Sequence, residues 1–179
     1  MPKTVFVVAK CAWETWQGKP DHHGPLGLQD WYRALKFAVD LVKSEEGSTI
    51  LFVTNLSPNP GETELENYVT FAKQMGLRDS QIQAVFEGEE TISQLDAAKR
   101  VAKTLPGRMV LVSTWTHYPR IAWMTRKEGC ERYGVFGIPM IKPMIVDFIF
   151  TVAWPILEVL HLDNWLHKKI RERRVQGKL

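Results

Sequence analysis

One stretch of the chain combines the residue types that bind and protonate anions. It covers residues 112–120 and reads Val-Ser-Thr-Trp-Thr-His-Tyr-Pro-Arg. Pro119 suits the first turn of a helix and so places Arg120 near a helix N-terminus, where the helix dipole disfavours a cation. An arginine beside free backbone N–H groups instead makes a site for a phosphate or carboxylate, and His117 can transfer a proton or hydrogen-bond the same anion. The alternative is that Arg120 pairs with a nearby acidic side chain while His117 caps the helix.

Further polar side chains are expected at the same edge of the fold, because ligands of open parallel sheets bind outside the carboxyl ends of the strands. Glu64 is expected to face Arg120 across the site and to orient a substrate, with His117 as the acid or donor. The candidate ligand-binding side chains that follow the predicted strands, besides Arg120, are Lys10, Asn55, Thr91, Ser113 and Thr114. These residues together make the predicted site.

Other chemistries have weaker support. A metal site from His22, His23, Glu64 and Glu87 lacks the spacing of known metal motifs, and adjacent loop histidines are more often solvated, so no metal is predicted. The absence of GxGxxG after the first strand, and of a P-loop, disfavours dinucleotide oxidoreduction. A nucleophilic serine lacks its GxSxG elbow, and Cys11 is more simply a small buried residue. The cofactor therefore stays unknown.

The elements that must position this site alternate along the chain. Short β-branched runs alternate with longer segments of helical period, which is typical of a parallel sheet covered on both faces. The expected strands are residues 4–10, 49–55, 82–86, 109–114 and 134–138, and the expected helices are residues 30–44, 62–75, 91–105 and 119–128. We predict a three-layer α/β domain over residues 1–140, with a mostly parallel sheet of about five strands.

Length and composition describe one ordinary globular domain. The chain has 179 residues, of which 45% are hydrophobic, and its 23 basic and 20 acidic residues give a formal net charge of +3. These values exclude collagen-like and disordered classes. Cys11 and Cys130 lie far apart without CxxC spacing, so we expect reduced thiols. Because the first apolar run is too short for a signal peptide, we expect a cytoplasmic protein.

The C-terminal region, residues 141–179, predicts an amphipathic helix and a basic tail. One helical face carries apolar side chains and the other carries polar ones; the apolar set is Ile145, Ile149, Val152, Ile156, Leu157 and Leu160. Residues 167–179 contain six basic residues and one acidic residue, a net charge of +5. Asp147 interrupts the apolar run, so a membrane-crossing helix is not expected. We expect the helix to pack on the domain or to pair in a homodimer.

A different partner for the same region is an anionic membrane surface, on which the helix would lie with the tail providing attraction. Nucleic acid is not an expected partner. The basic residues are terminal, without interleaved aromatic side chains or a recognisable binding module.

The anion-binding stretch also resembles a known signature. Residues 113–121 are similar to the TSxxHMxRA motif of the envelope-associated SanA, ElyC and YdcF family, whose biochemical function is largely unestablished. Glu64, twelve residues before Gly76, resembles the family's "sEA" helix, and Glu87 followed by Thr91 resembles its "E...NT.EN" segment. The resemblance covers about residues 49–129. It departs in the first two loops, where other residues replace the family's glycine-rich turns.

The resemblance implies a Rossmann-like domain with a polar pocket and a connection to the cell envelope. It assigns site roles to Glu64, Thr91, His117 and Arg120. From the residues of the predicted site, we expect the protein to bind a small molecule that bears a phosphate or carboxylate, either nucleotide-like or a lipid phosphate. The residues leave open whether turnover follows, so enzymatic activity is undecided. The alternative is a peripheral-membrane or dimeric scaffold protein that acts through the C-terminal helix and tail.

Overall fold

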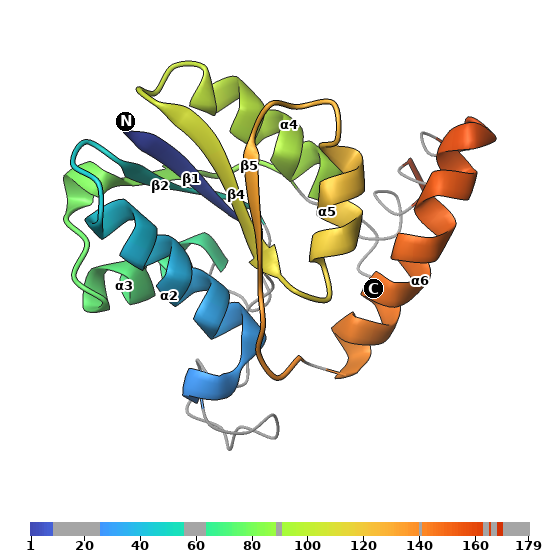
Figure 1. Ribbon diagram of the computed structural model, residues 1–179, viewed down its shortest axis with the longest axis horizontal. Helices are drawn as coiled ribbons and strands as arrows, with labels where there is room; N and C mark the ends of the chain where they lie inside the picture. The colour runs from blue at the N-terminus through green and yellow to red at the C-terminus, as the bar shows by residue number, and fades with distance from the viewer. Residues whose placement is uncertain are drawn as a thin grey trace.

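The computed structural model describes residues 1–8, 26–55, 64–88, 91–139, 141–162, 165, 168 and 169. Within these residues, five parallel strands form one sheet in the order β3-β2-β1-β4-β5, with helices on both faces (Figure 1). The strands are β1 (Lys3–Val8), β2 (Thr49–Val53), β3 (Ile82–Val85), β4 (Arg108–Thr114) and β5 (Glu131–Val135). The prediction of a three-layer Rossmann-like α/β domain is confirmed.

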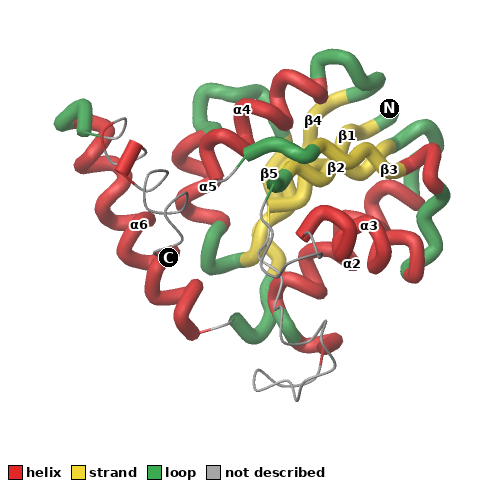
Figure 2. The backbone as a smooth tube through the Cα atoms, turned by 180° about the vertical axis from the view of Figure 1, so that it is seen from behind, coloured by secondary structure: helices red, strands yellow, loops and turns green. Residues whose placement is uncertain are grey.

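Helices cover the two faces of the sheet in pairs (Figure 2). The pair on one face is α2 (Asp30–Lys43) and α3 (Glu64–Gln74), and the pair on the other face is α4 (Thr91–Ala102) and α5 (Tyr118–Met124). Two short 3-10 helices, η1 (Leu26–Leu28) and η2 (Asp79–Gln81), precede α2 and β3. The strand order places β1 and β4 side by side at the sheet's topological switch point, where ligands of such folds bind.

Both faces of the inner strands are buried, which explains their continuous apolar sequences. In β1, Val5 and Val7 belong to the core beneath α2 and α3, whereas Phe6 and Val8 belong to the core beneath α4 and α5. Side chains alternate between the faces in the same way along β4, where Leu111 packs beneath α4 and α5. The polar residue two positions later, Ser113, therefore lies on that same face.

Most element boundaries lie within a few residues of their predicted positions. Gly76 adopts a φ of +90° shortly after α3, as its role as a helix stop predicts. The predicted helix at 119–128 ends earlier, at Met124, because the chain turns at Thr125, whose hydroxyl donates to the Ile121 carbonyl at 2.7 Å. Arg132 holds this turn through a 2.8 Å hydrogen bond to the Thr125 hydroxyl.

The last strand is displaced from its predicted position. It was expected at residues 134–138 but occupies Glu131–Val135, where Glu131 pairs with Val110 and forms a 2.7 Å salt bridge to Arg108. The more apolar segment after it turns away to meet the start of α2, and the Ile138 amide donates to the Leu28 carbonyl at 2.7 Å. Gly137 permits this approach, because a Cβ there would lie 2.5 Å from the Asp30 Cα.

The C-terminal helix α6 (Ile141–Val159) lies on the outer side of α5, away from the sheet (Figures 1 and 2). Its polar face makes the contact. The Glu158 carboxylate accepts hydrogen bonds from Trp123 Nε1 at 2.7 Å and from Arg126 at 2.5 Å, and Trp154 is buried. Among the described residues, no helix has both the length and the apolarity that a membrane span requires.

α6 itself packs against α5, but the apolar face of the helix is exposed. Ile145, Ile149, Val152 and Ile156 are each more than half exposed. The opposite face of α6 carries aromatic side chains beside its polar ones; there the Phe150 ring contacts Arg120, and Trp154 is buried. Homodimer formation through the exposed face stays a prediction.

Candidate functional site

The turn between β4 and α5 builds the centre of the site. The His117 amide donates to the Thr114 carbonyl at 3.1 Å, and the His117 carbonyl accepts from the Ile121 amide at 3.2 Å. His117 and Arg120 are three residues apart at the start of a helix, so their side chains lie on the same side. His117 is the N-cap residue, but its ring makes no capping hydrogen bond and instead contacts Arg120. The capping alternative for His117 is therefore wrong.

Arg120 is a buried cation, with only 8% of its surface exposed. Its Nη2 lies 2.9 Å from His117 Nδ1 and 3.2 Å from the hydroxyl of Thr91. Thr91 is the first residue of α4. The Phe150 ring of α6 lies with its centroid 5.3 Å from the guanidinium carbon, within the range of a cation–π contact. Three separate helices thus fix the position of one guanidinium.

The contact with Arg120 determines what His117 can do. A guanidinium only donates hydrogen bonds, so the imidazole nitrogen that faces it must be the acceptor. A neutral imidazole that accepts at one nitrogen carries its proton on the other, and that second nitrogen is a donor. The imidazole Nε2 also lies close to the same Arg120 Nη2, at 3.2 Å, so the ring faces the guanidinium with both nitrogens and orients it.

Two further predicted residues end β4. Ser113 is 1% exposed, and its hydroxyl has no hydrogen-bond partner within the part of the chain that the structure describes. A buried hydroxyl without a partner carries a free-energy cost, which a bound polar group would remove. Thr114 is also buried, and its hydroxyl lies 3.3 Å from the Thr116 hydroxyl. We refer to Arg120, His117, Thr91 and Ser113 as the Arg120 cluster.

Glu64 lies in a second buried group at the end of β2. Its carboxylate accepts a 2.8 Å hydrogen bond from the Thr54 hydroxyl and a 3.4 Å hydrogen bond from the Tyr68 hydroxyl. Tyr68 in turn stacks on Phe52, with centroids 5.3 Å apart. Because β1 separates β2 from β4, the two strand ends lie about 10 Å apart at the usual spacing of strands. Direct contact between Glu64 and Arg120 stays a prediction.

The connection after β3 joins these two groups. The Asn55 amide donates to the Gly88 carbonyl at 3.3 Å, which ties the end of β2 to the segment before α4. Gly88 has a φ of +83°, and a Cβ there would lie 2.8 Å from the Gln94 backbone nitrogen. The close packing that only glycine allows places Asn55 beside the start of α4, near Thr91.

Other predicted residues fall outside this arrangement or outside the description. Lys10, His22 and His23 lie outside the described residues, so their places in the site stay predictions. Glu87 forms a salt bridge with Arg100 at the surface. Among the described residues, no three metal-ligating side chains gather in a group.

Sequence reasoning missed three partners of the site. Thr54 follows β2 directly, and Tyr68 lies four residues after Glu64 on the same helix. Their positions in the sequence could therefore have predicted their contacts with Glu64. Phe150 had none, because its contact with Arg120 depends on how α6 docks.

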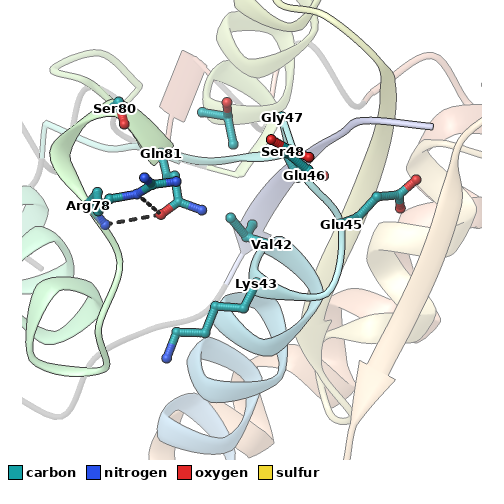
Figure 3. Close-up of a pocket in the computed structure, with 10 residues that line it drawn as sticks. Val42, Lys43, Glu45, Glu46, Gly47, Ser48, Arg78, Ser80 and Gln81 are labelled. Carbon is teal, nitrogen blue, oxygen red and sulfur yellow. Dashed lines mark hydrogen bonds between the residues drawn. The ribbon is translucent and has the colours of Figure 1, made fainter.

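Two hollows elsewhere on the surface differ from this site. The larger, of about 480 Å³, lies at the amino end of β2, where Arg78 donates to the Gln81 side chain (Figure 3). Its charged lining residues are Lys43, Glu45, Glu46 and Arg78, of which Glu45 is half-buried and the others are exposed. The smaller, of about 190 Å³, is lined in part by Cys130 and Leu111. Neither hollow contains a buried charge like that of Arg120.

Comparison with protein-family models, with curated proteins and with solved structures finds no match to this chain. The chemistry of the site must therefore be argued from its own side chains. Those side chains are a buried guanidinium, a buried imidazole in contact with it, and hydroxyl groups at the carboxyl edge of the sheet.

Proposed function

We propose that the Arg120 cluster binds a small molecule bearing a phosphate or carboxylate group. The observation that carries the proposal is the buried guanidinium of Arg120, which is oriented by Thr91 and His117. The Thr91 hydroxyl and the His117 ring hold the guanidinium in one direction at the carboxyl edge of the sheet. A charge-assisted hydrogen bond to an anion is among the strongest polar contacts available to such a group.

The other members of the cluster take complementary roles. The Ser113 hydroxyl lies buried on the α4 and α5 face and can donate to an anionic oxygen. His117 lies beside the guanidinium and is the proposed donor to a bound oxygen, and the proposed acid if a bound ester is turned over. The α5 helix is too short for its dipole to matter, so the side chains provide the anion site.

Glu64 is proposed to contact a second part of the same ligand. Its carboxylate, held by Thr54 and Tyr68, is an acceptor for hydroxyl or amino groups. A ligand that reaches from Arg120 to Glu64 must span about 10 Å, the separation of the two strand ends. Nucleotides and isoprenoid or sugar phosphates have this length. The resemblance to the envelope-associated family supports the same site residues.

A thermal-shift screen with inorganic phosphate, nucleotides, sugar phosphates and isoprenoid phosphates tests the proposal. A compound at a hundred times its dissociation constant stabilises the fold by about 2.7 kcal/mol. We expect Arg120→Ala to lose that stabilisation and Arg78→Ala, a matched substitution at the opposite edge of the sheet, to retain it. Because Arg120 is buried, Ser113→Ala is a second variant that should fold normally and bind more weakly. Equal stabilisation of all variants would overturn the proposal.

A further inference from the structure

The outward face of α6 is a continuous apolar surface. Seven side chains form it, and each is at least 51% exposed; they are Ile145, Phe148, Ile149, Val152, Ile156, Val159 and Leu160. Their spacings of three and four residues place them on one side of the helix, in a stripe about 22 Å long at 1.5 Å per residue. We call these residues the outward stripe. Contiguous apolar patches of this kind on soluble domains mark interaction sites.

The outward stripe is held away from the domain by contacts on the opposite face of α6. The Glu158 carboxylate accepts hydrogen bonds from Trp123 and Arg126. The Phe150 ring lies against the Arg120 guanidinium. Turning the stripe inward would break these contacts and expose the buried Trp154. The stripe is therefore exposed because the opposite face of α6 makes the contacts with the domain.

The charge of the sequence that follows the stripe points to its partner. The stripe contains no charged side chain, and residues 167–179 carry a net charge of +5. Lys168 and Lys169 are exposed. A second copy of the chain would bring the same positive charge to the interface, whereas an anionic bilayer supplies the opposite charge along with an apolar layer.

We propose that α6 docks this protein on an anionic membrane surface, with the outward stripe inserted at the boundary between headgroups and acyl chains. The helix would lie in the plane of the membrane, as amphipathic helices with an apolar face and neighbouring basic residues do. Phe148, and Trp165 beyond the end of the helix, are exposed aromatic side chains of the kind enriched at that boundary. This inference is independent of ligand binding at the Arg120 cluster.

Sedimentation of the full chain with lipid vesicles tests the inference. The probes are vesicles of phosphatidylcholine alone and of phosphatidylcholine mixed with phosphatidylglycerol. We expect binding to the mixed vesicles, weaker binding to the neutral ones, and loss of binding at high salt, because basic residues supply part of the attraction.

Two matched substitutions separate the stripe from general surface hydrophobicity. Phe148, in the stripe, is 70% exposed, and Phe86, at the end of β3, is 60% exposed. Phe148→Glu should weaken binding to the mixed vesicles about tenfold or more, and Phe86→Glu should leave it nearly unchanged. Both changes are at exposed positions, so both variants should fold.

Three results would overturn the inference. One is a wild-type chain that stays in solution with mixed vesicles, and another is a Phe148→Glu variant that binds them as well as the wild type. The third is a wild-type dimer that Phe148→Glu dissociates, observed without any vesicle binding. That result would make a second copy of the chain the occupant of the outward stripe.

Discussion

The Arg120 cluster and the outward stripe of α6 depart from the usual distribution of polarity in opposite ways. One buries a cation, and the other exposes a row of large apolar side chains. We propose a binding partner of matching chemistry for each of them. The same helix joins them, because Phe150 on the inner face of α6 contacts Arg120 while the stripe lies on the outer face.

The two regions also differ in how binding free energy is distributed. At the Arg120 cluster, one guanidinium held by specific hydrogen bonds dominates, so single substitutions should remove binding. Along the outward stripe, seven side chains each contribute a part, so one apolar truncation should weaken binding only slightly. The predictions below concern the contacts that dock α6 and those that build the Arg120 cluster, from the largest expected effect on stability to the smallest.

Replacing Trp154 by alanine should release α6 from the domain. Trp154 is buried, and truncation of a buried tryptophan costs about 3 to 5 kcal/mol. We expect a loss of about 3 kcal/mol in the free energy of unfolding, measured in urea. Trp165→Ala, at an exposed tryptophan, is the matched control and should change stability little. Equal stabilities of the two variants would show that α6 is not docked through its inner face.

Removing the Thr91 hydroxyl should loosen Arg120 without removing its charge. Thr91→Val deletes the 3.2 Å hydrogen bond to Arg120, which contributes about 1 kcal/mol. We expect the compound that stabilises the wild type in the thermal-shift screen to bind about fivefold more weakly. Thr70→Val removes an exposed hydroxyl bonded to the Glu66 carbonyl and serves as the control. If Thr91→Val binds the compound as tightly as the wild type does, Thr91 has no role in ligand binding.

Acid should weaken the contact between α6 and α5. Hydrogen bonds from Arg126 and then Trp123 lower the pKa of the Glu158 carboxyl below its ordinary value. A lowered folded-state pKa means that this contact stabilises the fold above the unfolded-state pKa and is lost as pH falls through the folded-state pKa. The stability difference between wild type and Glu158→Gln, measured by urea unfolding across pH, should therefore shrink toward acid pH. A constant difference would contradict this account of the contact.

The smallest effect on stability is expected at Ser113. Its hydroxyl is buried without a partner among the described residues, so Ser113→Ala should leave the free energy of unfolding unchanged or slightly higher. Affinity for the compound that stabilises the wild type should nevertheless fall by up to about tenfold, because one donor to the anion is lost. Unaltered affinity in a stable variant would leave Ser113 without a role in binding.

Local patterns were sufficient to predict most of the fold. Parallel strands buried on both faces must be apolar, so alternating apolar runs and helical periods predicted the sheet. The displaced β5 shows the limit of this reasoning. An edge strand is only partly buried, so the polar residues Glu131 and Arg132 fit it, while the apolar segment after Val135 pairs elsewhere.

For the site and for α6, contacts between residues close in sequence could be predicted, and contacts between distant segments could not. His117 and Arg120 are close in sequence, so their spacing predicted a shared position. The contact between Phe150 and Arg120 joins distant segments, which periodicity cannot pair. Periodicity likewise predicted the apolar stripe of α6 but not its direction, because the pattern does not say which face meets the domain.

The most direct test of the central claim is to locate an added phosphate by nuclear magnetic resonance. The chain would be labelled with ¹⁵N, and the arginine side-chain and histidine ring resonances would be followed as inorganic phosphate is added. His117 and Arg120 would be assigned with His117→Gln and Arg120→Lys variants. We expect both residues to shift with a common saturation curve while Arg78 does not move. Shifts confined to Arg78 at the opposite edge, or shifts that never saturate, would contradict an anion site at Arg120.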